Sequence, residues 1–107
     1  MEHYQLAALR PPENAYVEFL RKADLSMGVY RLSAGAEDKQ KPHSEDEVYF
    51  VTSGRAHFRA GDRELAVKPG DILFVPAGEP HRFFDIREDL EVLVFFGPAE
   101  GSRTVTR

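Results

Sequence analysis

The chain has 107 residues, a formal net charge of −4 and 42% hydrophobic residues, which fits one globular domain spanning 1–107. Lysine and arginine are scattered along the chain, so no basic stripe is available to bind a nucleic acid. The absence of cysteine excludes disulfides, thiolate metal sites and thiol nucleophiles. No apolar run approaches the roughly 20 residues of a membrane span, and the first residues lack a signal-peptide core. We therefore expect a cytoplasmic protein with no membrane partner.

Short β-type runs follow one another along the chain, separated at intervals of about ten residues by Gly, Pro or Asp. The runs are 15–22, 27–34, 47–53, 55–60, 63–68, 71–77, 81–86 and 90–97. Only 3–10 has a helical character. Alternation in 55–60 and 63–68 predicts an apolar face that carries Phe58 and Leu65. Eight such strands predict a jelly roll or small barrel, because closure removes exposed sheet edges.

A possible metal site emerges from the parity of one strand. Residues two apart in a strand point to the same side. If pairing begins near residue 43, one face carries the side chains of His43, Glu45, Glu47, Tyr49 and Val51. A second histidine, His81, follows a turn and opens a later strand, where Phe83 and Asp85 are expected to share its face. Two imidazoles and a carboxylate meeting inside a barrel would bind a divalent metal ion, Fe, Mn, Zn, Ni or Cu.

These residues resemble the two sequence motifs of the cupins. The first motif, at 35–54, runs from Gly35 through Lys41-Pro42-His43 and Glu47 to Gly54; the second, at 70–85, runs from Gly70 through Pro76-Ala77-Gly78 and His81 to Asp85. The resemblance implies a cupin-type double-stranded β-helix, that is, a jelly-roll barrel. It also implies that His43, Glu47 and His81 are metal ligands, and that the protein is a homodimer in which the strand at 15–22 can be exchanged between partners.

The sequence departs from the cupin pattern at two positions. Lys41 stands where the family has its first ligand histidine, and Asp85 stands where Asn is usual. A lysine ammonium is no ligand at neutral pH, so one coordination position is left open or filled by water. Lys41 can instead hold an anionic ligand, and Gln40 can supply an amide oxygen if the segment is irregular. Asp85 either orients His81 or is an ordinary acid at the barrel edge.

Three functions remain open at this point. The first is a metalloenzyme, dioxygenase-like or isomerase-like, acting on a small organic molecule. The second is a non-enzymatic module that binds a small ligand or sugar, or serves as a sensor, with the metal structural or absent; the missing histidine favours it. The third is a metal-free enzyme that uses His81 and Tyr49 as acid and base. No residue is assigned as catalytic, and Tyr49 and Lys41 are the only candidates. His57 is expected at the surface.

Overall fold

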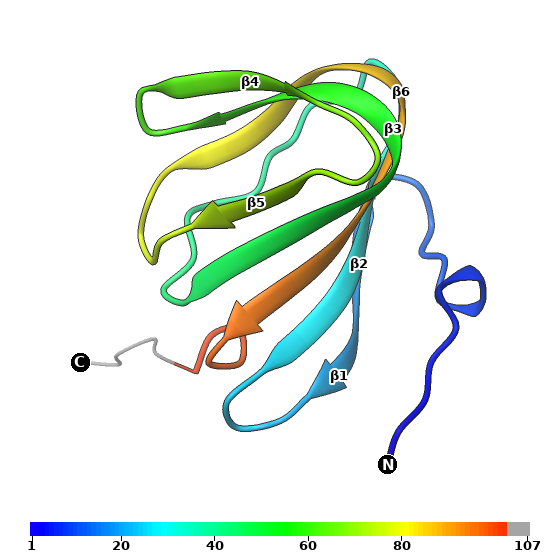
Figure 1. The fold of residues 1–107 in the computed structure, drawn as a ribbon, viewed down its shortest axis with the longest axis vertical. Helices are drawn as coiled ribbons and strands as arrows, with labels where there is room; N and C mark the ends of the chain where they lie inside the picture. The colour runs from blue at the N-terminus through cyan, green and yellow to red at the C-terminus, as the bar shows by residue number, and fades with distance from the viewer. Residues whose placement is uncertain (103–107) are drawn as a thin grey trace.

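The computed structural model describes residues 1–102, and within them one antiparallel sheet of six strands curls on itself (Figure 1). The strands are β1 (Ala15–Arg21), β2 (Ser26–Leu32), β3 (Asp46–Ala60), β4 (Arg63–Val67), β5 (Ile72–Val75) and β6 (His81–Gly97). A 3-10 turn, η1 (Leu6–Ala8), precedes them. The prediction of an all-β barrel is therefore confirmed.

Two long strands, β3 and β6, organise the sheet. The strand order is β1-β2-β6-β3-β4, and β5 pairs with β3. The first part of β3, 47–50, pairs with β5 and with the last part of β6, whereas 56–60 pairs with β4 and with the first part of β6. Figure 1 shows both strands bending along their length, so each contributes to two walls of the barrel.

The expected eight strands are six because two predicted turns are bulges inside continuous strands. The pairing of β3 with β6 shifts register three times between Val51 and His57. Gly54 has φ +93°, and a Cβ on it would lie 2.3 Å from the carbonyl oxygen of Asp89. Only glycine permits this close approach of two backbones. The local sequence cannot separate a turn from a bulge here, because both use the same backbone conformation.

Alternation along the strands fills the barrel with side chains. Glu47, Tyr49 and Val51 are all buried, as their common parity predicted. The rings of Tyr49, Phe58 and Phe83 pack with centroids 4.7 to 5.7 Å apart. Leu65 pairs with Phe58 across β3 and β4, so it lies on the predicted apolar face, but the residue is 37% exposed whereas Phe58 and Val67 are buried. The buried hydrophobic residues of the core cluster are Leu32, Tyr49, Val51, Ala56, Phe58, Val67, Val75, Phe83, Ile86, Leu90, Val92, Val94 and Phe96.

The N-terminal strand completes the sheet of its own chain. β1 pairs with β2 from Ala15 to Arg21, with one bulge near Glu18. The exchange of this strand between two copies, and the homodimer itself, stay predictions. No helix among residues 1–102 has the length and apolarity needed to cross a membrane.

Candidate metal centre

The structure brings together the three predicted ligands. One nitrogen of His43, one nitrogen of His81 and one carboxylate oxygen of Glu47 all lie within 4.8 Å of one another. Glu47 is the second residue of β3, and His81 is the first residue of β6. His43 lies in the irregular segment that leads into β3.

Hydrogen bonds join the two segments that carry the histidines. The carbonyl oxygen of His43 accepts a bond of 2.7 Å from the N–H of Gly78. The carboxylate of Asp46 accepts one of 3.0 Å from the N–H of Ala77. The turn that delivers His81 is therefore tied to the chain on both sides of Glu45. The Pro76-Ala77-Gly78 turn of the second motif therefore holds His81 next to the segment that carries His43 and Glu47.

The ring of His81 is held in one orientation. Its Nδ1 lies 2.8 Å from the carbonyl oxygen of Glu79. A carbonyl only accepts, so Nδ1 carries the proton and donates it, leaving Nε2 to face Glu47 and Tyr49. Nε2 lies 3.0 Å from Glu47 Oε1 and 3.0 Å from Tyr49 Oη. A backbone carbonyl on the far nitrogen is the usual support of a metal-binding imidazole.

The carboxylate of Glu47 is the most informative group of the cluster. Its side chain is 2% exposed, and neither oxygen has a hydrogen-bond donor aligned on it among the described residues. His81 Nε2 lies within ion-pair distance of Oε1, but it can compensate this charge only when the ring is protonated on both nitrogens. A buried carboxylate left in this state is costly unless a cation completes it. The donor set therefore fits a divalent metal ion.

The buried groups perturb one another's ionisation. Burial alone lowers the pKa of His81, but the Glu47 carboxylate and the Glu79 carbonyl outweigh burial, and the pKa is raised overall. Burial, followed by the charge of Glu47, raises the pKa of Tyr49 well above its ordinary value. The hydroxyl of Tyr49 therefore stays protonated and acts as a hydrogen-bond donor.

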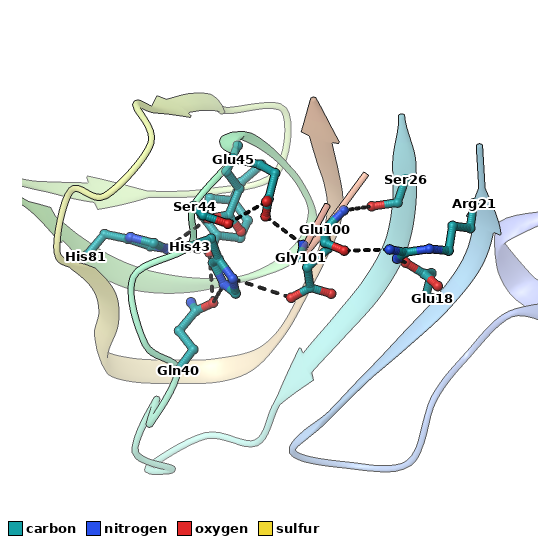
Figure 2. A network of polar contacts seen from close by, with 12 residues as sticks. Glu18, Arg21, Ser26, Gln40, His43, Ser44, Glu45, His81, Glu100 and Gly101 are labelled. Atoms are coloured by element: carbon teal, nitrogen blue, oxygen red, sulfur yellow. Dashed lines mark hydrogen bonds and ion pairs between the residues drawn. The ribbon is translucent and has the colours of Figure 1, made fainter. Parts of the chain in front are cut away.

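His43 closes the cluster on the side of a cavity. Its ring packs against the edge of Phe96, with centroids 4.7 Å apart. Its Nδ1 lies 3.4 Å from Glu100 Oε2, and its Nε2 lies 3.5 Å from Gln40 Oε1. Figure 2 shows His43 between Gln40 and Glu100, with His81 on the other side of the ring. Glu100 was not foreseen, because it follows the last strand and is far from His43 in the sequence.

The cavity has a volume of about 640 Å³, which is within the range of small-molecule sites. His43 and Glu47 line it, together with the aromatic side chains of Tyr16, Tyr30 and Phe96. A ligand in this cavity would meet both the candidate metal centre and apolar surface.

The remaining sequence predictions have mixed outcomes. Lys41 is exposed and lines the cavity, and it forms no ion pair with the acids of the described chain. Asp85 does not share the face of His81: its φ of +48° turns it outward, and Ile86 is buried instead. Asp85 contacts His57 and Arg87 at 3.2 Å, so it is an acid of the barrel surface. His57 is 35% exposed, as expected of a surface residue.

Comparisons with known proteins agree with this architecture. The sequence profile of the family described as Cupin domain matches residues 28–96. An uncharacterized protein of Streptomyces coelicolor is 51% identical over 82% of this chain and 84% of its own length. Acireductone dioxygenase of Exiguobacterium sibiricum is 35% identical over 51% of this chain, but the match spans only 33% of that enzyme.

A solved structure shows the same fold. A double-stranded β-helix protein of Klebsiella pneumoniae superposes with a TM-score of 0.81 at 21% identity, over 92% of this chain and 91% of that chain. The predicted double-stranded β-helix is thereby confirmed.

Proposed function

This chain belongs to the cupin domain family, and on that premise we propose that it binds one divalent metal ion and uses it to transform a small organic molecule. The ligands in this proposal are His43, Glu47 and His81. The observation that carries it is the buried Glu47 carboxylate, which has no hydrogen-bond donor aligned on either oxygen among the described residues and lies beside two imidazoles. The likeness to an acireductone dioxygenase over half of the chain favours a dioxygenase-like reaction over an isomerase-like one.

A metal ion held by two histidines and one carboxylate supplies Lewis-acid chemistry or oxygen activation, with positions left for substrate. The protein's own groups orient the substrate. Tyr16, Tyr30 and Phe96 offer apolar surface to the body of a ligand. The free ammonium of Lys41 at the cavity wall favours a ligand with a carboxylate or an ionised hydroxyl group. We therefore expect a small organic acid or an enolic compound as substrate.

The metal-free acid–base reading finds less support. Tyr49 Oη and His81 Nε2 lie 3.0 Å apart, so the pair that this reading needs is present. Both side chains are buried, and the cavity is lined by His43 and Glu47 instead. The raised pKa of Tyr49 also makes its hydroxyl a poor proton donor or acceptor near neutral pH.

A binding module without catalysis is the second candidate. Lys41 favours it, because a cation stands where the cupin motif has its first ligand histidine. An ammonium near the site opposes a divalent ion and attracts an anion. In this case the cavity would hold a small anionic ligand, and a metal ion would serve only to bind it.

Metal analysis of protein purified without chelator or affinity tag tests the first candidate. We expect near-stoichiometric metal in the wild-type protein and a large loss in His43→Ala and Glu47→Ala. His57→Ala is the matched control, because His57 lies on the outer surface and should leave the metal content unchanged. Oxygen consumption with a panel of small organic acids then separates an enzyme from a carrier. Wild-type protein without bound metal, even after incubation with Fe²⁺, Mn²⁺ or Ni²⁺, would refute the metalloenzyme.

A further inference from the structure

An amide group lies beside the three candidate ligands. Gln40 belongs to the irregular segment before β3, and its Oε1 is 3.5 Å from His43 Nε2 and 3.1 Å from Tyr49 Oη. Gln40 also lines the cavity. Figure 2 shows its side chain pointing toward the ring of His43. Its oxygen therefore lies at the edge of the cluster, on the side of the substrate cavity.

The direction of this amide is set by Asp38. The Nε2 of Gln40 donates a hydrogen bond of 2.9 Å to Asp38 Oδ2. An ionised carboxylate can only accept, so the nitrogen of the amide must face Asp38 and the oxygen must face the cluster. The reverse orientation would place two acceptors against each other. The same oxygen has two lone pairs: Tyr49 donates to one at 3.1 Å, and the other faces His43 Nε2 at 3.5 Å, on the side of the cluster.

Asp38 is itself held firmly by two strands. It is 5% exposed and accepts a bond of 2.8 Å from the hydroxyl of Tyr30 in β2. It also accepts a bond of 2.9 Å from the backbone N–H of Phe83 in β6. The backbone N–H of Gln40 adds a fourth donor at 3.2 Å. A carboxylate with this many partners inside a barrel is a rigid support.

We propose that Gln40 supplies a fourth protein ligand to the metal ion through Oε1, and that Asp38 is its positioning residue. This inference rests on the proposed metal centre. It explains how the site can bind a metal ion although Lys41 stands at the position of the first motif histidine. Gln40, the preceding residue, takes the place of that histidine because the irregular segment turns its side chain inward. A neutral amide oxygen beside one carboxylate and two imidazoles gives a mixed oxygen and nitrogen donor set. Oxygen ligands of this kind suit Mn²⁺ and other hard ions better than an additional imidazole does.

Titration of chelator-treated protein with Co²⁺ tests the inference, with the visible absorption of bound Co²⁺ as a second readout. We expect Gln40→Ala to weaken Co²⁺ binding about 10- to 100-fold, the range seen when supporting groups of metal sites are removed. The Co²⁺ spectrum should also change, because one ligand is lost. Gln40→Asn withdraws the same oxygen by one methylene and should act in the same direction. Asp38→Asn should weaken binding by about tenfold, since an asparagine no longer dictates the direction of the amide.

Gln5→Ala is the matched control, because Gln5 is an exposed glutamine that does not line the cavity. The Co²⁺ affinity and spectrum of this variant should equal those of the wild type. Circular dichroism in chelator identifies any variant that fails to fold. If Gln40→Ala and Gln40→Asn fold and bind Co²⁺ with wild-type affinity and spectrum, the inference is overturned and the three-ligand site survives. If the wild-type protein binds no Co²⁺, the site and the inference fall together.

Discussion

Replacing Glu47 by glutamine removes a negative charge from the interior of the barrel and leaves the shape of the side chain almost unchanged. In the structure this carboxylate is buried, and no described donor is aligned on either oxygen. The basic group beside it is His81, whose Nε2 lies 3.0 Å from Glu47 Oε1. The effect of Glu47→Gln on the chelator-treated protein therefore depends on whether His81 is protonated.

The sign of the effect follows from the raised pKa of His81. A base whose pKa is higher in the folded state stabilises that state fully below its unfolded pKa, about 6.5. This contribution is lost as the pH rises through the folded-state pKa. Above that point Glu47 faces a neutral ring, and a buried acceptor without a partner costs about 1–3 kcal/mol.

We therefore expect Glu47→Gln to be more stable than the wild type by about 1–3 kcal/mol at pH 9. At pH 6 the advantage should vanish or reverse, because the ion pair with His81 is then intact. For a domain of this size each kcal/mol corresponds to a shift in Tm of about 4–8 °C. The wild type alone should gain about 2.7 kcal/mol from a metal ion at 100 times its Kd.

Thermal unfolding followed by circular dichroism, in chelator and then in excess Co²⁺, measures these differences. Glu91→Gln is the matched control, because Glu91 is also buried but accepts a bond of 2.8 Å from the hydroxyl of Thr52. It should not be stabilised at either pH. A chelator-treated Glu47→Gln protein that is less stable than the wild type at pH 9 would show that the carboxylate is satisfied without an ion. The reasoning for the metal centre would then be wrong.

Three further outcomes are expected. The affinity for Co²⁺, measured by titration, should fall by about tenfold for each unit by which the pH drops below the pKa of His81. Because the pKa of His81 is raised, this fall should begin at a higher pH than for a free imidazole. An affinity that stays constant from pH 8 to 6 would exclude His81 as a ligand. Gly54→Ala should lower the free energy of unfolding, measured in urea, by at least about 1–3 kcal/mol, and by more than Gly70→Ala does. Both glycines have positive φ, but of the two only Gly54 has backbone atoms within contact distance of an added Cβ. Equal costs would contradict this packing argument. Light scattering at micromolar concentration should give the mass of a dimer. The reason is that Ile72 and Phe74 are 70% and 62% exposed on β5, which pairs only with β3 among the described strands. A monomer mass would contradict the predicted homodimer.

The sequence by itself determined the barrel and the inward face of its third strand. Period-two alternation is a local property, so Glu47, Tyr49 and Val51 could be placed inside from their parity alone. The spacing of glycines and prolines around His43 and His81 matched the cupin motifs and predicted the three converging ligands. These signals survive folding because they depend on regular strands and short turns.

Tertiary structure decided what lies outside regular strands. Asp85 broke the parity of β6 through one residue with positive φ. Gln40 and Asp38 come from an irregular segment, where side-chain direction has no period; long-range bonds to β2 and β6 set their places. Glu100 reaches His43 from beyond the last strand. Contacts of this kind depend on the closure of the sheet, which joins residues that no local pattern relates.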